Sequence, residues 1–355
     1  AFLEYVVGEK RTLLFVLRRQ DRLRLTAHVI PIGEEALRRR VAAFRRKIDA
    51  RALDFRDDAR QLYDAIIAPA RADLTGVDNL TLMPDAGLWD LPFQALLDPS
   101  RRYLLEQVSI SYAPSITVLG QMMQSARNAA PADYAGTLLA LGNPRMSNQP
   151  APRPATRGAS PAPLPEAERE VRMLGQLYGP RESRVYTGPE ARETRIKQEA
   201  GRFRIIHIAT HGYLDNSSPM YSYVRLAEPR EAGEDGFLEA REISNLDLRA
   251  SLTVLSACET GRGRVGAGEG VIGLAWALFV AGSPSSVVSQ WKVDSASTAN
   301  LMLEFHKGYR EKLRAPSSPL TTAGVLRQAS LTLMRDAQYA HPFYWAGFVL
   351  LGDGR

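Results

Sequence analysis

The chain has 355 residues, of which 45% are hydrophobic and 24% charged, with a net charge of +6 at pH 7. Its longest apolar stretch, around 273–282, is far shorter than the roughly 20 residues of a membrane span, so we expect no membrane partner. A single cysteine, Cys258, excludes an internal disulfide. The first residues also lack the charged start of a signal peptide, and we therefore expect a cytoplasmic location.

The basic residues are mostly arginines, and they are scattered along the chain. Many stand beside Asp and Glu on helical patterns, as in "EEALRRRVAAFRRKIDARALDFRDDAR" over 34–60. This arrangement favours solvated helix faces over a nucleic-acid interface, so we do not expect direct nucleic-acid binding. Strong salt dependence of a retained nucleic acid would support the other interpretation.

The N-terminal part, 1–130, is predicted to form one lobe. Its apolar periodicity predicts strands over 1–30, two helices over 34–72, a strand, turn and helix over 79–97, a strand over 104–115 and a helix over 116–128. Within the first strands we expect Val6, Leu14, Val16 and Leu25 to point inward. A distant duplication of the second lobe is compatible with this alternation.

The second predicted lobe spans 131–355. Strands and helices alternate from 136 onward, which is typical of a mostly parallel sheet covered on both faces. The segment over about 145–163 is rich in Pro, Ala, Ser and Arg and has no apolar period, so we expect a disordered loop there. The expected fold class is therefore α/β.

Three strands of this lobe that are expected to be buried end in residues able to take part in catalysis or binding. "RIIHIATHG" ends at His211 and Gly212, "LTVLSACETG" at Cys258, and "SVVSQWKVD" at Trp291 and Asp294. Sites in open parallel sheets form at the carboxyl ends of the strands. If these strands are parallel neighbours, their ends meet at one edge of the sheet.

Cys258 and His211 have the chemistry of a nucleophile and its base. A thiolate needs a nearby base or cation, and an imidazole titrates near neutrality. The N–H groups of Gly212 and Cys258 could stabilise a tetrahedral oxyanion, and a backbone carbonyl could orient the imidazole. By residue type alone, a lone cysteine at a strand end is more often a small core residue than a nucleophile.

Other motifs in the lobe are weaker. His207 is expected to be a satisfied core histidine, because the spacing "HIATH" lacks the glutamate of a zinc helix. The glycines of 261–270 lack the G-K-[ST] of a phosphate loop, although they could form an activation loop. No G-x-S-x-G is present. We therefore expect no metal and no cofactor.

His211 precedes Cys258 by 47 residues, which is close to the separation of about 50 residues in caspases, although the caspase pentapeptide is absent. The chain resembles the CHAT domain family, a caspase-like module of the separase–gingipain–caspase group of cysteine peptidases. The similarity lies in "MPDAGLWDLPFQALLD" (83–98), "VSISYAPSITVLGQM" (108–122), "HIATHGYLDNSSPMYSYVRLA" (207–227), "LTVLSACETGRGRVGAGEGVIGLAWALFVAGSPSSVVSQWKVDSAST" (252–298) and "HPFYWAGFVLLGD" (341–353).

The resemblance implies a caspase-like three-layer sandwich with an N-terminal, pseudo-protease-like lobe. It implies a Cys/His dyad, with His211 as base, Cys258 as nucleophile, and Gly212 and the Cys258 amide as oxyanion donors. It also implies a regulated effector protease that cleaves a bacterial protein in defence or programmed cell death. The expected partners are that substrate and an activating partner or an N-terminal repeat domain.

Substrate preference is the least constrained part of the prediction. Asp294 resembles an acidic pocket residue of separase-like relatives, which would favour cleavage after Arg or Lys; alternatively it caps the helix that follows. Trp291 precedes it at the same strand end and is also expected to bind substrate. Asp215 is expected on the cleft wall, and Glu259 could reach the cleft or be solvated. A catalytically quiet scaffold is the alternative function.

Overall fold

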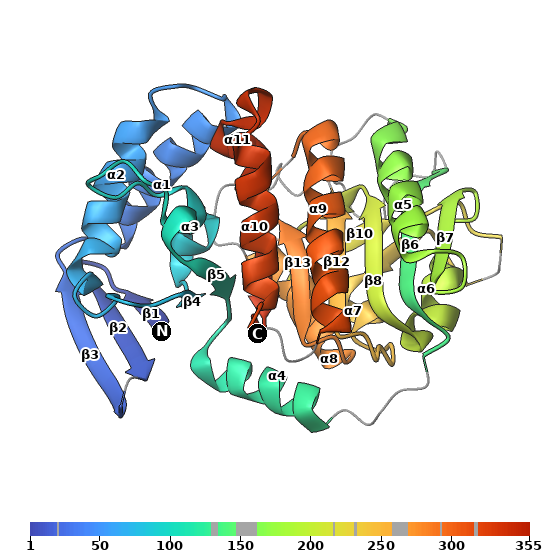
Figure 1. The fold of residues 1–355 in the computed structure, drawn as a ribbon, viewed down its shortest axis with the longest axis horizontal. Coiled ribbons are helices and arrows are strands. Elements are labelled where there is room, and N and C mark those ends of the chain that lie inside the picture. Colours follow the sequence, from blue (N-terminus) through green and yellow to red (C-terminus); the bar gives the residue numbers. More distant parts are fainter. Residues whose placement is uncertain are drawn as a thin grey trace. The chain divides into compact units, whose positions relative to one another are not determined.

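The computed structural model describes residues 1–19, 21–128, 134–146, 162–215, 217–230, 233–257, 269–291, 293–315 and 319–355 (Figure 1). It divides the chain into two compact units. The first combines Ala1–Gln121 with Gly308–Arg355, and the second contains the described residues of 122–307. The predicted division near residue 130 assigned 308–355 to the second lobe, whereas these residues pack in the first unit. Of the predicted loop over 145–163, residues 147–161 lie outside the described residues.

The first unit is built on a mixed sheet. The strands lie in the order β3-β2-β1-β4-β5-β14; β1, β4, β5 and β14 run parallel, and β2 and β3 are antiparallel. Its strands are β1 (Phe2–Val7), β2 (Thr12–Arg19), β3 (Leu23–Ile30), β4 (Asn79–Met83), β5 (Ser109–Tyr112) and β14 (Phe348–Gly352). Its helices are α1 (Glu34–Asp49), α2 (Phe55–Ile66), α3 (Leu104–Gln107), α10 (Thr322–Met334) and α11 (Pro342–Trp345), and α4 (Ile116–Asn128) crosses into the second unit.

The predicted inward positions of the first strands are half right. Leu14 and Val16 are buried on one face of the sheet, as expected. The prediction is wrong for Val6 and Leu25, which are 47% and 65% exposed, respectively. Leu25 lies directly opposite Leu17 of β2, and successive residues of a strand alternate between the two faces. An apolar residue on the open face therefore has the same pattern in the sequence as one on the covered face.

Among the described residues, the second unit contains five parallel strands of the large sheet and a small antiparallel sheet. The orders are β13-β12-β8-β6-β7 and β11-β10-β9. The parallel strands are β6 (Gly136–Pro144), β7 (Ser183–Gly188), β8 (Phe203–Thr210), β12 (Leu252–Ala257) and β13 (Ser285–Ser289), and the small sheet has β9 (Gly212–Tyr213), β10 (Tyr223–Arg225) and β11 (Phe237–Glu239). The helices are α5 (Pro165–Tyr178), α6 (Glu193–Glu199), α7 (Ala240–Ile243), α8 (Glu269–Val280) and α9 (Ser295–Arg314), whose last residues belong to the first unit.

Helices cover both faces of the parallel sheet. His207 of β8 contacts side chains from α5 and α9, so these two helices share one face, and Figure 1 shows them in front of the strands. On the other face, Tyr186 of β7 bonds to Glu199 of α6, and Thr253 of β12 bonds to Ser283, just after α8. This is the helix–sheet–helix layering that the alternating sequence predicts.

The three strands with chemically interesting ends are parallel neighbours. β8 pairs with β12, and β12 pairs with β13. In this register Ala257, the last residue of β12, lies opposite Thr210, the last residue of β8. The expected convergence of the strand ends at one sheet edge is confirmed for β8 and β12.

The close approach of α5 to the sheet gives a first prediction. A Cβ at Gly142 of β6 would lie 2.6 Å from the carbonyl oxygen of Ala167 in α5. Because that neighbour is backbone, we expect Gly142→Ala to destabilise the protein by about 1–3 kcal/mol in chemical unfolding. The matched change Gly120→Ala, where nothing lies within 4 Å in α4, should stabilise it by about 0.5–1 kcal/mol. Equal effects of the two changes would contradict this packing.

Candidate functional site

His211 directly follows β8, and its imidazole is held by a backbone carbonyl. Its Nε2 lies 2.9 Å from the carbonyl oxygen of Ala162, an acceptor only, so Nε2 carries the hydrogen and donates it. In the neutral ring Nδ1 is then the basic nitrogen. Nδ1 is buried and has no hydrogen-bond partner among the described residues. The side chain is therefore oriented, and its proton-accepting atom is left available.

Cys258 and Glu259 lie outside the described residues. The chain reaches Cys258 directly from Ala257, which pairs with Thr210, the residue before His211. Thr210 and Ala257 are paired across β8 and β12, and the two predicted dyad residues, His211 and Cys258, are the next residues in the chain after them. The dyad itself stays a prediction.

Gly212 begins the small sheet beside His211. The N–H of Arg225 in β10 donates to the carbonyl of His211 (2.8 Å), which makes these two residues a hydrogen-bonded pair. Pairs in an antiparallel ladder alternate, so Gly212 and Val224 form the next, non-bonded pair. The N–H of Gly212 consequently points away from β10, as an oxyanion donor would require.

Asp215 lies in the turn after β9. Its Oδ1 accepts hydrogen bonds from the N–H groups of Ser217 and Ser218, both 2.9 Å, and its own N–H donates to the hydroxyl of Ser222 (3.0 Å). These bonds shape the turn, since aspartate readily bonds to backbone two residues on. Its place on a substrate cleft stays a prediction.

Trp291 and Asp294 lie between β13 and α9. Trp291 is buried, with 2% exposed. The Oδ1 of Asp294 accepts from the N–H of Ser297 (3.0 Å), within the first turn of α9. The capping alternative for Asp294 is thus confirmed. Substrate binding by Asp294 and Trp291 stays a prediction.

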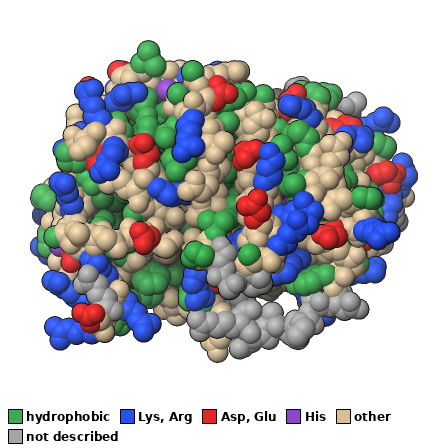
Figure 2. Space-filling model, viewed as in Figure 1, with side chains coloured by type: hydrophobic (Ala, Val, Ile, Leu, Met, Phe, Trp, Pro, Cys, Tyr) green, Lys and Arg blue, Asp and Glu red, His purple; other side chains and the backbone are tan. Residues whose placement is uncertain are grey.

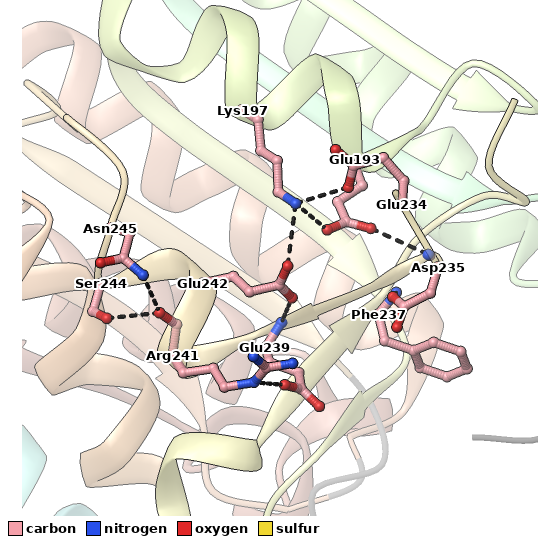
Figure 3. Close-up of polar contacts among 11 residues, drawn as sticks. Glu193, Lys197, Glu234, Asp235, Phe237, Glu239, Arg241, Glu242, Ser244 and Asn245 are labelled. Atoms are coloured by element: carbon pink, nitrogen blue, oxygen red, sulfur yellow. Dashed lines mark hydrogen bonds and ion pairs between the residues drawn. The ribbon is translucent and has the colours of Figure 1, made fainter. Parts of the chain in front are cut away.

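A lysine with three carboxylates, which no sequence motif indicates, anchors the far side of the small sheet. Figure 3 shows Lys197 of α6 pointing toward Glu193, Glu234 and Glu242, at 2.6, 2.7 and 3.2 Å from its Nζ. Glu193 also accepts the N–H of Gly236, next to β11. The spacing of Glu193 and Lys197 on one helix could have indicated a pair, but only the fold brings the other two.

Burial and hydrogen bonding in this cluster shift the pKa of Glu193. Burial, followed by the hydrogen bond with Glu234, raises the pKa of Glu193 to about 7. The pKa of Lys197 is raised by its carboxylate partners, which outweigh burial, so the ammonium stays charged. The cluster links α6 to the strands that lead back to Gly212.

The prediction that His207 is a satisfied core histidine is confirmed. Its ring is fully buried and lies 2.8 Å from a Glu170 oxygen and 3.1 Å from His306. The described residues hold no group of three or more His, Cys, Asp or Glu suited to a metal ion.

Family comparison decides the classification. The model of the CHAT domain family matches residues 56–353. The chain belongs to the CHAT domain family. The resemblance seen in the sequence motifs is therefore confirmed.

Curated relatives and solved structures extend the comparison. Tetratricopeptide repeat protein 28 of Homo sapiens is 25% identical over 336 residues, covering 83% of this chain and 13% of the relative; the Mus musculus protein gives the same values. The Saccharomyces cerevisiae separase–securin complex gives a TM-score of 0.51 at 13% identity, covering 82% of this chain and 18% of that one. The complex of Porphyromonas gingivalis RgpB pro- and mature domains gives 0.50 at 14% identity, covering 90% and 76%.

These likenesses establish the fold of this CHAT domain as a caspase-like α/β sandwich with a mostly parallel sheet. The chain spans about an eighth of the length of the curated relatives it matches, and those relatives are tetratricopeptide repeat proteins. The pseudo-protease character of the N-terminal lobe stays a prediction.

The surface and the helices of the CHAT domain bear on its other expected partners. Figure 2 shows Lys and Arg side chains spread over the viewed face with Asp and Glu among them, rather than in one basic field. In the part of the chain that the structure describes, no helix has both the length and the apolar character to cross a membrane.

The raised pKa of Glu193 predicts a pH dependence. Because this pKa lies near 7 in the folded CHAT domain and near 4.5 in the unfolded chain, its contribution to stability is full below about pH 4.5 and is lost as pH rises through about 7. Glu193→Gln, which stays neutral, should remove that loss when urea unfolding is measured from pH 4.5 to 8. Glu182→Gln, at an exposed carboxylate, is the charge-matched control. Identical pH profiles for the two variants would contradict the assignment.

Proposed function

We propose that this CHAT domain is a cysteine endopeptidase with a His211–Cys258 dyad. One observation carries the proposal: the imidazole of His211 is bound at Nε2 by the Ala162 carbonyl, and its buried Nδ1 is unpartnered among the described residues. A core histidine would have both nitrogens satisfied, as His207 has. The paired ends of β8 and β12 support Cys258 as the missing partner.

The chemistry follows from this tautomer. Nδ1 of His211 takes the proton of the Cys258 thiol, and the sulfur attacks the substrate carbonyl carbon. The N–H groups of Gly212 and Cys258 stabilise the oxyanion that forms. When the C–N bond breaks, the proton passes from His211 to the leaving amine, and water then hydrolyses the thioester. The Ala162 carbonyl keeps the imidazolium oriented through both transfers.

Thiol reactivity tests the dyad directly. An ordinary thiol has a pKa of about 8.5 and is only a few per cent thiolate at pH 7, whereas an adjacent imidazolium lowers that pKa. We expect iodoacetamide to alkylate the wild type at pH 7 about tenfold faster than the His211→Ala variant. Cys258 is the only cysteine, so labelling reports this site alone.

The control is His28→Ala, because His28 lies in the first unit and pairs with Asp73. This variant should alkylate at the wild-type rate. Equal rates in wild type and His211→Ala would contradict the dyad and would favour the catalytically quiet scaffold.

We further propose that Asp294 selects Arg or Lys before the cleaved bond. Its cap uses Oδ1, and Oδ2 has no partner among the described residues. A carboxylate in a pocket gives a strong preference, because an unpaired buried charge is costly. That the substrate is a bacterial protein cleaved in defence or cell death, after activation by a partner or a repeat domain, stays a prediction.

Two variants separate the cap from the charge. Asp294→Asn keeps a good capping oxygen but loses the charge, so it should retain stability and lower the preference for Arg over Leu substrates by roughly tenfold or more. Asp294→Ala should show the same loss and also a destabilisation of about 1 kcal/mol. An unchanged preference in a peptide library with both variants would leave Asp294 as a cap alone.

A further inference from the structure

A chain of buried polar side chains lies under the strands that carry the dyad. Glu170 of α5, His207 of β8 and His306 of α9 are each no more than 2% exposed. Glu170 Oε1 lies 2.8 Å from Nε2 of His207, and the other ring nitrogen of His207 lies 3.1 Å from Nε2 of His306. His306 Nδ1 in turn lies 3.2 Å from the Tyr178 hydroxyl. None of these groups takes part in the proposed chemistry.

One assignment of hydrogens satisfies this whole chain. Burial and the neighbouring His207 hold the pKa of His306 well below its usual range, so His306 is neutral. It accepts from Tyr178 at Nδ1 and donates from Nε2 to His207. His207 then donates from Nε2 to Glu170. The chain ends on a carboxylate, whose charge makes this last bond the strong one.

Glu170 also reaches the second dyad strand. The hydroxyl of Ser256 in β12 donates to Oε2 of Glu170 over 3.4 Å. His207 stands four residues before His211 on β8, and Ser256 stands two residues before Cys258. One carboxylate on α5 therefore bonds to both strands, just before the ends on which the proposed chemistry depends.

The segment that leads into α5 carries the group that orients His211. Ala162 lies three residues before the start of α5 at Pro165, and its carbonyl accepts the Nε2 hydrogen of His211. Asn143 at the end of β6 accepts the N–H of Leu164 (2.7 Å), and its side-chain N–H donates to Glu168 of α5 (2.9 Å). The Ala162 carbonyl is therefore placed by β6 and the start of α5 together.

We propose that Glu170 is a positioning residue: by clamping α5 to β8 and β12, it holds the Ala162 carbonyl on the imidazole of His211. Packing at Gly142 keeps α5 on the sheet without the clamp, but the Ala162 carbonyl shifts and the His211 ring loses its fixed tautomer and orientation. The inference rests on the proposed function for its kinetic readout only. The state of the His211 ring can be measured whether or not the protein cleaves peptides.

The test compares three variants on α5. Glu170→Ala removes the clamp. Glu170→Gln keeps the shape and one acceptor oxygen for His207, but its NH2 group cannot accept from Ser256; it weakens the clamp and guards against a failure of the first variant to fold. Glu166→Gln is the matched control, since Glu166 is a partly exposed partner of Arg169 on the same helix.

The readouts are ¹⁵N NMR of histidine-labelled protein, with His211 assigned from the His211→Ala spectrum, and steady-state kinetics. In wild type and Glu166→Gln, Nε2 of His211 should be the protonated nitrogen. In Glu170→Ala the Nδ1–H form should become populated, and kcat should fall by roughly 10- to 100-fold with KM within about twofold. Glu170→Gln should shift both in the same direction by a few-fold.

The outcomes separate the two proposals. If neither wild type nor any variant cleaves peptides, the proposed function fails, while the tautomer still tests the clamp. An unchanged His211 tautomer in folded Glu170→Ala would overturn the positioning role, as would an unchanged tautomer in Glu170→Gln if Glu170→Ala does not fold.

Discussion

The parallel pairing of β8 with β12 is the constraint on which the candidate site depends. It aligns Thr210 with Ala257, so the two residues that follow these positions leave the sheet together. Burial of side chains on defined faces sets this register, because a slip by one residue would turn every side chain of a strand to the opposite face. The proposed dyad therefore depends first on strand register, which brings the two strand ends together, and then on the chemistry of the side chains.

Burying the polar side chains of Glu170, His207 and His306 beneath these strands costs free energy, and this cost is consistent with a positioning role. An uncompensated charge or amide in a protein interior is strongly destabilising, and here each member finds a partner. The same face holds Gly142, where the sheet has no room for a side chain against α5. Close packing and buried hydrogen bonds thus fix α5 against the sheet from two directions, and the carbonyl of Ala162 is fixed with it.

The sequence predicted the parts of the site that depend on alternation and strand ends. His211, Gly212 and the buried His207 follow from an apolar strand with polar residues at defined places, and the sandwich follows from alternating elements. The sequence did not reveal Ala162, because any residue has a carbonyl and only the fold brings this one to His211. It did not reveal Glu170 or the Lys197 cluster either, since their partners are distant in the chain. The prediction that Leu25 is buried was wrong for a different reason: periodicity does not show which face of a strand the helices cover.

The central claim is that His211 activates Cys258 for attack on a peptide carbonyl. The most direct measurement is covalent trapping by a peptide acyloxymethyl ketone ending in arginine, with the adduct located by mass spectrometry. The account predicts one adduct per chain, on Cys258, formed by the wild type and lost in His211→Ala. A wild-type protein that forms no adduct, or a His211→Ala variant that forms it equally fast, would contradict it.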